Sequence, residues 1–336
     1  MQYKICITLD YELCLGKNTG TVLNTIIKPM NELSSIFDRY NVKVTLFVDS
    51  SYLLALKKQK SNFPVLEEDY RMIVNQLQEL NSKGHSIQLH IHPQWIYSYF
   101  DGSKWNLDFK HYKLSDLDKK VALIHFNEAK ELLESIIEKE VVAFRAGGFS
   151  LQSFKNYYEM LFINNIKIDS SVVPLTFEQS EYQWYDYKSA PLHPYLFFDD
   201  ILIPSKEGKI CEVPISVIKY NPFYYAYLKK KTEFNTKFNL FSEGQGIGLN
   251  KSKWIRMYSQ FKQLFRTKIM MASIDGFSSV LLPMVFDDYK KNNRNNDNFI
   301  VIGHPKSASP NSIMYVNDFI NKTYQNNSYI TIENFK

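Results

Sequence analysis

The sequence predicts an α/β protein whose parallel sheet closes, wholly or in part, into a barrel. Three observations favour this fold class. Short apolar, β-branched runs alternate with longer segments of helical periodicity through the first half of the chain. Roughly seven such strand–helix units can be counted, and this alternation is typical of parallel strands with helices outside. The 336 residues, 45% of them hydrophobic and 15% aromatic, suffice for one barrel-sized domain and exclude a mainly disordered chain.

The elements of the first half follow from periodicity and from stop signals. Apolar residues recur at helical spacing from Ile27 to Ile36, a second helical pattern stops before Gly84, and Ser115 is a candidate cap for a third helix. The strands are expected at residues 3–9, 42–48, 86–91, 141–144 and 166–168, and the helices at residues 24–40, 66–80, 114–138 and 154–163.

The second half begins with an irregular stretch and ends with a strand at 299–302, a helix at 313–321 and a strand at 329–332. Residues 219–268 carry eleven Lys and Arg against two Glu, so their net charge is +9 while the rest of the chain is net −4. Aromatic and aliphatic residues between 254 and 265 recur at helical spacing with basic residues among them. Such a helix can lie on an anionic membrane surface. The alternative, slightly favoured, is a helix packed on the barrel with a solvated basic face. We expect one barrel domain over 1–336, with 219–298 as an insertion or subdomain.

Charge and cysteine content exclude several functional classes. The net charge of +5 is mild and mixed in sign, and no nucleic-acid-binding module is recognisable. Cys6, Cys14 and Cys211 form neither an even disulfide framework nor a CxxC zinc pair. The start of the chain lacks the apolar stretch of an export signal, which predicts a cytoplasmic protein, with peripheral contact at the inner membrane face as a further hypothesis.

Polar residues follow the predicted strands at their carboxyl ends, where a barrel carries its chemistry. Two of these ends hold pairs of residues spaced i, i+2, which places both side chains on one face of an extended chain. A third end holds an arginine followed by two glycines, and the late strand ends in Gly-His-Pro. The polar residues at these ends are Asp10, Glu12, His90, His92, Arg145 and His304.

Together these groups suit metal-assisted amide hydrolysis. Two imidazoles and one carboxylate form an open zinc site, and zinc lowers the pKa of a bound water to about 7. A second carboxylate could act as general base, and a nearby arginine would keep it ionised. A histidine on the far side could protonate a leaving amine.

An ordered set of motifs resembles those of the polysaccharide deacetylase family, the NodB-homology group of carbohydrate esterases. The matching segments cover 3–174 and 299–334 and little between them. They are residues 8–12, 44–48, 84–93, 145–150, 168–171, 212–214 and 303–305. The resemblance implies a distorted (β/α)7-type barrel, the NodB-like deacetylase barrel, interrupted in its C-terminal half by the basic, aromatic insertion.

Carried over residue by residue, the resemblance implies Asp10 as general base, Arg145 as its partner and His304 as general acid. It also implies His90 and His92 as ligands of a divalent metal, most readily Zn²⁺. The family usually has adjacent aspartates, whereas Tyr11 intervenes here, so Glu12 is expected to supply the metal carboxylate, with Asp10 as the alternative.

Two further departures concern the histidines. The family's ligand histidines are usually four residues apart, whereas His90 and His92 are two apart, the following proline identifying the second ligand. The fourth motif lacks its downstream Asp-Trp, which leaves Asp169 as a candidate partner for His304.

Several nearby residues are candidates for substrate contact. Trp95 suits the face of a sugar ring, although a packing role fits it equally well. Gly147, Gly148 and Phe149 follow Arg145 in the third motif and are expected beside the substrate. The remaining histidines have no spaced partners and are interpreted as structural or exposed; they are His85, His111, His125 and His193.

The sequence therefore predicts a metal-dependent hydrolase that removes an N-acetyl group from a sugar. The expected substrate is a surface polysaccharide or its precursor, which could be lipid-linked. The alternatives are a deformylase or other amidase on the same barrel, or a non-catalytic carbohydrate-binding or assembly protein that keeps the fold.

Overall fold

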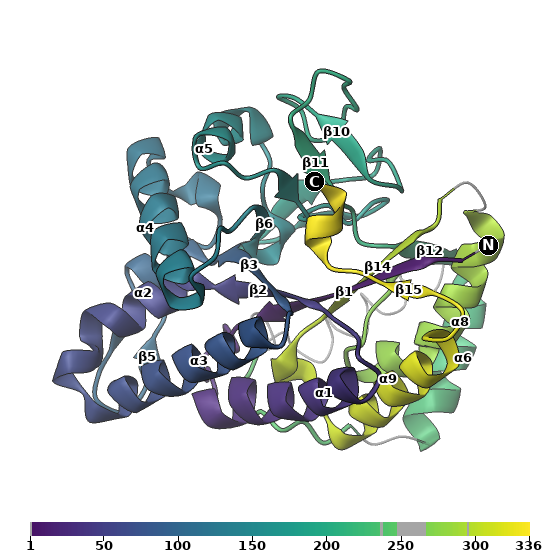
Figure 1. Ribbon diagram of the computed structural model, residues 1–336, viewed down its shortest axis with the longest axis horizontal. Helices are drawn as coiled ribbons and strands as arrows, with labels where there is room; N and C mark the ends of the chain where they lie inside the picture. The colour runs from purple at the N-terminus through teal and green to yellow at the C-terminus, as the bar shows by residue number, and fades with distance from the viewer. Residues whose placement is uncertain (1, 236–237, 247–266, 294–295) are drawn as a thin grey trace.

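A curled, mostly parallel sheet forms the centre of the molecule in this computed structural model, which describes residues 2–235, 238–246, 267–293 and 296–336 (Figure 1). Its strands lie in the order β10–β11–β7–β6–β3–β2–β1–β14, with the short β15 beside the start of β1. Every pair on this path is parallel except β10–β11. The strands are β1 (Lys4–Tyr11), β2 (Thr45–Asp49), β3 (Ser86–Ile91), β6 (Ala143–Ala146), β7 (Ile168–Asp169), β10 (Tyr195–Phe197), β11 (Ile210–Glu212), β14 (Asn298–Gly303) and β15 (Ser328–Tyr329).

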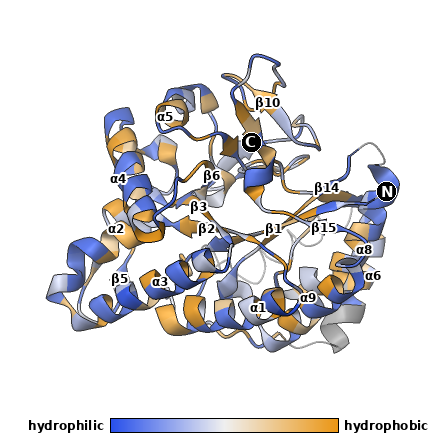
Figure 2. Ribbon diagram, in the orientation of Figure 1, coloured by the Kyte–Doolittle hydropathy of each residue, from blue (hydrophilic) through white to orange (hydrophobic). Residues whose placement is uncertain are grey.

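Helices cover the outside of the sheet, and neighbouring helices along this cover contact one another (Figure 1). Their hydrophobic stripes face the strands while the hydrophilic stripes face outward (Figure 2). Pro64 occupies the first turn of α3, and the side chains of Asp118 and Ser309 cap α4 and α9. The helices are α1 (Lys28–Arg39), α2 (Ser50–Gln59), α3 (Pro64–Ser82), α4 (Lys119–Ile137), α5 (Tyr158–Ile163), α6 (Pro222–Asn235), α8 (Gly276–Asn292) and α9 (Pro310–Thr323).

The register of the parallel strands aligns their carboxyl ends along one rim. Asp49 at the end of β2 pairs with His90 in β3, and His90 pairs with Arg145 in β6. On the other side of β1, Leu9 pairs with Gly303 at the end of β14. Residues that are far apart in the sequence are thus brought to the same rim by backbone pairing alone.

An irregular segment, residues 213–216, joins the two sides of the curled sheet. The Ile215 amide donates to the Val172 carbonyl at 3.0 Å, and the Ser216 amide donates to the Ile300 carbonyl of β14 at 3.0 Å. The sheet therefore closes through single hydrogen bonds and not through a regular strand pair. The predicted distorted barrel with outer helices is confirmed.

Most predicted elements are confirmed within a few residues, with two corrections in the first half and one at the end of the chain. Helix α2 was not predicted, because it begins directly after β2 and no turn residue separates them. Ser115 is not a helix cap: it lies in the 3₁₀ turn Leu114–Asp116, and α4 begins after Asp118. The final predicted strand is shorter than expected, since Ile332–Phe335 forms a helical turn.

Within the predicted insertion, β12 (Val217–Tyr220) pairs with β13 (Lys268–Met271) in an antiparallel ladder. Helix α8 then packs on α9. The basic amphipathic segment expected at residues 254–265 lies outside the described residues. No helix among the residues that the structure describes combines the length and hydrophobicity required to cross a membrane.

Two further antiparallel strand pairs lie outside the main sheet. In the first, β4 (Tyr99–Phe100) pairs with β5 (Trp105–Asn106), and in the second, β8 (Phe177–Gln179) pairs with β9 (Trp184–Asp186). The remaining helical turns are Leu23–Ile27, Lys60–Asn62, Pro93–Ile96, Gly147–Phe149, Phe154–Asn156 and Pro305–Ser307.

Candidate active site

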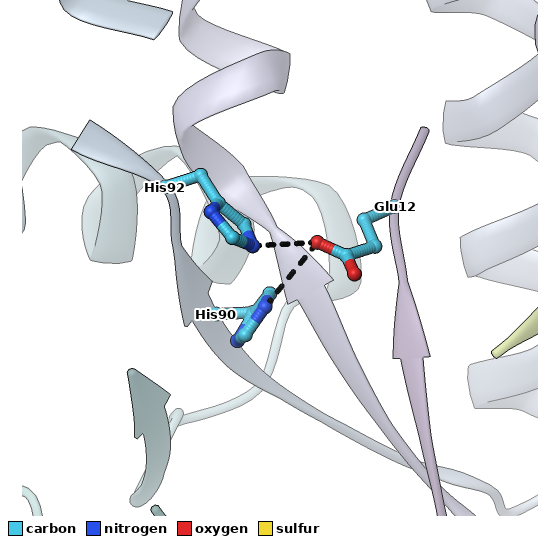
Figure 3. A group of neighbouring side chains, drawn as sticks. All are labelled: Glu12, His90 and His92. Atoms are coloured by element: carbon cyan, nitrogen blue, oxygen red, sulfur yellow. Dashed lines mark ion pairs between the residues drawn. The ribbon is translucent and has the colours of Figure 1, made fainter. Parts of the chain in front are cut away.

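Glu12, His90 and His92 converge at the carboxyl ends of β1 and β3 (Figure 3). Glu12 Oε2 lies 2.7 Å from His92 Nε2 and 3.5 Å from His90 Nε2. All three side chains are buried. The alternating geometry of each strand places the two members of each i, i+2 pair on the same side, as the sequence predicts.

The donor atoms of this group fit a divalent metal ion. His90 Nδ1 lies 2.7 Å from the backbone carbonyl of Arg145, which can only accept, so in the neutral ring Nδ1 carries the proton and Nε2 keeps a free lone pair. Glu12 Oε2 and His90 Nε2 are buried, and among the residues that the structure describes neither atom makes a hydrogen bond, although Oε2 lies close to both imidazoles. His92 Nε2 also faces Glu12 Oε2, and two ring nitrogens with one carboxylate oxygen are a suitable donor set for zinc.

Charged neighbours hold Glu12 ionised. Burial alone would raise the pKa of the Glu12 carboxyl, but the Lys306 ammonium and the two imidazoles lower it well below its usual range. Lys306 Nζ donates to Glu12 Oε1 at 2.6 Å, which leaves Oε2 directed at the imidazoles. Burial opposes a raised pKa at His90, but Asp10 and Glu12 raise it nonetheless.

A second set of contacts supports His92 from behind. The Trp95 indole donates to Asp49 Oδ2 at 2.8 Å, and Asp49 Oδ1 lies 3.4 Å from the His92 backbone nitrogen. On the other side the ring packs against Gly147, where an added Cβ would lie 2.6 Å from His92 Nδ1. Gly147 is therefore needed for the close approach of the ring to the backbone.

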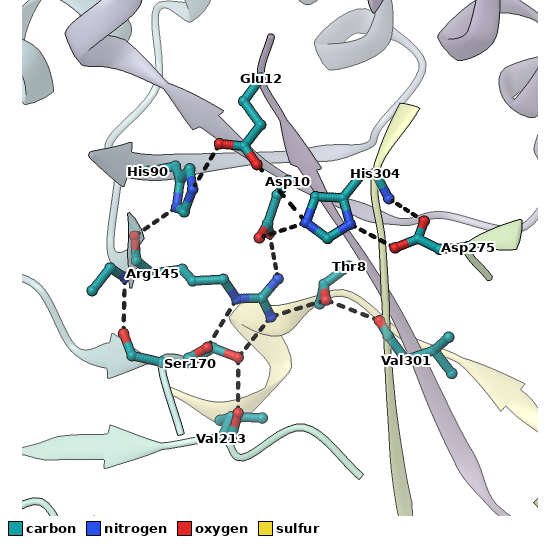
Figure 4. A network of polar contacts seen from close by, with 12 residues as sticks. Thr8, Asp10, Glu12, His90, Arg145, Ser170, Val213, Asp275, Val301 and His304 are labelled. Carbon is teal, nitrogen blue, oxygen red and sulfur yellow. Dashed lines mark hydrogen bonds and ion pairs between the residues drawn. The ribbon is translucent and has the colours of Figure 1, made fainter. Parts of the chain in front are cut away.

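Asp10 is held by Arg145 in the interior of the barrel (Figure 4). Arg145 Nη1 donates to Asp10 Oδ1 at 2.6 Å, and both side chains are almost completely buried. Burial alone would raise the pKa of the Asp10 carboxyl, but the Arg145 guanidinium, followed by His90 and His304, lowers it far below its usual range. Asp10 is therefore ionised at neutral pH.

The guanidinium of Arg145 is itself fixed by a full set of partners (Figure 4). Its Nε donates to the Ser170 carbonyl at 2.8 Å, and its Nη2 donates to Thr8 Oγ1 and Ser170 Oγ, both at 2.9 Å. The group also lies over the Phe47 ring, 4.2 Å from the centroid. A buried cation paired in this way is a rigid counter-ion for Asp10.

His304, at the end of β14, lies across Asp10 from His90 (Figure 4). Its Nε2 is 3.5 Å from Asp10 Oδ2 and 3.8 Å from Glu12 Oε1. Its Nδ1 lies 2.7 Å from Asp275 Oδ2, and its backbone amide donates to Asp275 Oδ1 at 2.8 Å. Burial opposes protonation, but the charges and hydrogen bonds of Asp275 and Asp10 raise the pKa of His304 to about 10.

The expectation that Asp169 partners His304 is wrong, because Asp275 takes that place. Asp169 lies in β7, directly across from Glu212 in β11. Its Oδ1 accepts from Ser171 Oγ at 2.9 Å, and Ser171 Oγ in turn accepts from the Ala146 amide at 2.9 Å. Burial raises the pKa of both Asp169 and Glu212. Through Ser171, Asp169 thus supports the end of β6.

These groups open into a pocket of about 180 Å³. Gly148 and Phe149 line it as expected, whereas Gly147 lies beneath His92. Trp95 does not line it: the side chain is 1% exposed, and its indole is bound to Asp49, so its role is support. The lining residues are Asp10, Glu12, Leu15, His90, His92, Tyr112, Gly148, Phe149, Gln183, Gly246, His304 and Lys306.

Sequence reasoning missed two groups around this pocket, Asp275 and Asp49, and the contact between Lys306 and Glu12. Asp275 precedes α8 and carries no spacing relation to His304. Lys306 follows the Gly-His-Pro motif, but its contact with Glu12 depends on how β14 lies beside β1. Asp49 ends a predicted strand, and the rule that polar residues matter at strand ends could have found it.

The chain matches no protein-family model and no curated protein. Solved structures resemble it over nearly its whole length at low sequence identity. A probable polysaccharide deacetylase of Pseudomonas aeruginosa is 12% identical, with a TM-score of 0.50 over 99% of this chain and 89% of that chain. The allantoinase Puue is 11% identical, with a TM-score of 0.51 over 99% of this chain and 88% of that chain.

A branching enzyme of Thermococcus kodakaraensis is 10% identical, with a TM-score of 0.51 over 100% of this chain and 71% of that chain. The chain therefore has the fold of polysaccharide deacetylases, as its motifs predict. Enzymes with other reactions share this fold, so the likeness establishes architecture, and the chemistry must be argued from the side chains.

Proposed function

We propose that this protein is a metal-dependent hydrolase that removes an N-acyl group, most simply acetyl, from a sugar. The observation that carries the proposal is the convergence of the Glu12, His90 and His92 group with two further residues, Asp10 and His304, on one small pocket. Metal ligands, a base and an acid at one pocket are the groups that amide hydrolysis requires.

In this proposal Glu12, His90 and His92 hold a divalent cation, most readily Zn²⁺. The cation would polarise the acyl carbonyl and lower the pKa of a water molecule. Lys306 binds Glu12 Oε1 and keeps Oε2 directed at the two imidazoles. The role of Lys306 is thus to position the carboxylate and to balance part of its charge in a buried site.

Asp10 accepts the proton of the attacking water. Arg145 binds Oδ1, so Oδ2, which lies 3.5 Å from His304 Nε2, is the oxygen left to take the proton. The Arg145 contacts also prevent rotation of the carboxylate, which keeps Oδ2 in one position. The water oxygen attacks the acyl carbon as this proton leaves.

His304 protonates the departing nitrogen. Its raised pKa keeps the imidazolium present at neutral pH, and Asp275 fixes the ring through Nδ1, so Nε2 carries the proton toward the pocket. The C–N bond breaks as the amine takes this proton. Acetate and a free amino sugar are the products.

The proposed substrate is an N-acetylated glycan of a surface polysaccharide or of its precursor, and the proposed location is the cytoplasm. A lipid-linked substrate and contact with an anionic membrane stay predictions from the basic sequence between 219 and 268, since residues 247–266 are not described.

The proposal is tested by measuring metal content and acetate release on the purified, zinc-loaded protein with N-acetylglucosamine oligomers. Asp10→Asn should lower the rate by roughly 10²–10⁴-fold while the bound metal is kept. Asp287→Asn, the same change on the exposed surface of α8, should leave the rate unchanged. Full activity in Asp10→Asn would refute the assignment of the base, and release of no acyl group from any N-acylated glycan would refute the function.

A further inference from the structure

A short segment of the insertion lies directly over the loop that follows β1. We call residues 241–246 the strap and residues 13–20 the β1 loop. The Gly16 amide donates to the Gln245 carbonyl at 2.8 Å, and the Gln245 amide donates to the Asn18 carbonyl at 2.8 Å. Asn18 Nδ2 adds a bond to the Glu243 carbonyl at 3.1 Å. Two backbone segments more than 200 residues apart are thereby joined like paired strands.

A buried hydroxyl anchors the strap. Ser242 is 8% exposed, and its Oγ lies 2.9 Å from Thr25 Oγ1 and 3.5 Å from Cys14 Sγ. The Phe241 amide donates to the Ala308 carbonyl, 3.2 Å away, in the loop that carries His304. The strap therefore bridges the loop after Glu12 and the loop after His304.

The strap and the β1 loop are in contact through their backbones, with no space between them. A Cβ added to Gly16 would lie 2.3 Å from the Gln245 carbonyl oxygen. A Cβ added to Gly244 would lie 2.6 Å from Cys14 Sγ. Contacts this close fix the position of the β1 loop, because neither segment can carry a larger residue at these points.

Both partners of this contact line the candidate pocket. Leu15, the neighbour of Gly16, and Gly246, the last residue of the strap, lie in its wall together with the metal-ligand group. The volume of about 180 Å³ is below the roughly 300–1,000 Å³ of pockets that bind drug-sized ligands, so the space suits a group of a few heavy atoms.

We infer that the strap and the β1 loop determine acyl selectivity: by holding Leu15 and Gly246 in the pocket wall, they restrict the site to formyl and acetyl groups. This inference rests on the proposed function. It assigns the selection of the acyl group by size to residues outside the motifs that carry the proposed chemistry.

Two substitutions change the wall in opposite directions. Leu15→Ala removes a branched side chain and enlarges the pocket. Gly246→Val adds bulk at the wall, and among the residues that the structure describes a Cβ at Gly246 would meet no atom within 4 Å. Gln245→Ala is the matched control, because the exposed Gln245 side chain makes none of the strap contacts, which come from its backbone.

The experiment compares kcat/KM for N-formyl, N-acetyl, N-propionyl and N-butyryl glucosamine on the zinc-loaded full chain. A hydrophobic pocket discriminates one methylene by roughly 10–200-fold. The wild type should therefore prefer acetyl over butyryl by about tenfold or more, Leu15→Ala should reduce this preference about tenfold, and Gly246→Val should disfavour acetyl against formyl by about tenfold. Gln245→Ala should keep the wild-type order.

Calorimetric binding of formate, acetate, propionate and butyrate to the same zinc-loaded proteins separates the two proposals. If no amide is hydrolysed, the proposed function fails. Weaker binding of longer carboxylates by the wild type, with a chain-length profile that shifts in Leu15→Ala and Gly246→Val, would still support the inference that Leu15 and Gly246 limit the length of the bound group. Butyrate and acetate bound equally by the wild type, or a chain-length profile unchanged in both variants, would overturn it. Should Leu15→Ala not fold, Gly246→Val decides.

Discussion

Two cavities lie at opposite ends of the same sheet, and the smaller one is the proposed active site. The amino-end cleft, beside Lys4 of β1 and Asn298 of β14, has a volume of about 1120 Å³, whereas the carboxyl-end pocket has about 180 Å³. Size alone would select the cleft as the binding site. The states of the polar groups reverse this choice.

In the cleft, polar side chains are satisfied by local partners. Asn292 and Asn293 donate to backbone carbonyls one helical turn earlier in α8, and Asn296 donates to the Tyr289 hydroxyl. In the pocket, Glu12 Oε2 and His90 Nε2 are buried without partners. Buried groups that stay unpartnered, beside carboxyl and imidazole groups with shifted pKa values, indicate a functional site better than volume does.

Removing a proposed metal ligand from the carboxyl-end pocket should have the largest effect on activity of all the substitutions that compare the two cavities. His92→Ala should lose bound zinc and lower the rate of acetate release by about 10³-fold or more, since metal chemistry contributes several kcal/mol of transition-state stabilisation. Metal mass spectrometry and acetate release measure the two effects. His111→Ala, a partly exposed histidine paired with Asp108, is the control and should keep both. Full zinc content in His92→Ala would contradict the ligand assignment.

Asp275→Asn should change the pH dependence of the enzymatic activity. Asp275 and Asp10 raise the pKa of His304 to about 10 against the opposing effect of burial. A general acid acts only while protonated, so activity falls as the pH rises through this pKa. Without the Asp275 charge, the alkaline limb of kcat/KM should move to lower pH by roughly one unit or more.

The comparison variant for this effect is Asp169→Asn, which alters the carboxylate expected from the sequence to partner His304. Its alkaline limb should stay at the wild-type position, because Asp169 contacts Ser171 and not His304. Superimposable pH profiles for wild type and Asp275→Asn would contradict the assignment of Asp275.

Trp95→Phe should affect stability and not substrate affinity. The change removes the donor to the buried Asp49 carboxyl, which should lower the free energy of unfolding by about 1–3 kcal/mol. The KM for the glycan should stay within about twofold, because Trp95 does not line the pocket. Denaturant unfolding and steady-state kinetics provide the two values. A tenfold rise in KM at unchanged stability would instead support the interpretation that Trp95 stacks on a sugar ring of the substrate.

The smallest effect is expected in the amino-end cleft. His193→Ala changes an exposed residue of its lining, and surface substitutions of this kind alter stability by less than about 0.5 kcal/mol. The rate of acetate release should equal that of the wild type. A large loss of activity in His193→Ala would indicate that the substrate binds in the amino-end cleft, which contradicts the proposed site at the carboxyl ends of the strands.

The sequence predicts those parts of the site that depend on local geometry. Alternation along a strand puts Asp10 with Glu12 and His90 with His92, and parallel pairing brings strand ends to one rim. These two rules require only that the strands be recognised. The distorted barrel follows from the same alternation of strands and helices.

Contacts that depend on long-range packing could not be predicted in this way. Asp275 reaches His304 because residues 272–274 lie beside Ile302 in β14, a pairing that no local pattern announces. Trp95 follows a His-Pro turn, and the sequence gives no sign that its ring turns toward Asp49 instead of the pocket. Helix α2 was missed because Asp49 serves both as the last residue of β2 and as the cap of the helix.

The most direct test of the site is the crystal structure of the zinc-loaded protein with anomalous diffraction data collected at the zinc absorption edge. We expect one strong anomalous peak per chain, from a zinc ion bound by a Glu12 carboxylate oxygen and by one ring nitrogen from each of His90 and His92. A zinc ion bound elsewhere, or one held without these two imidazoles, would contradict it.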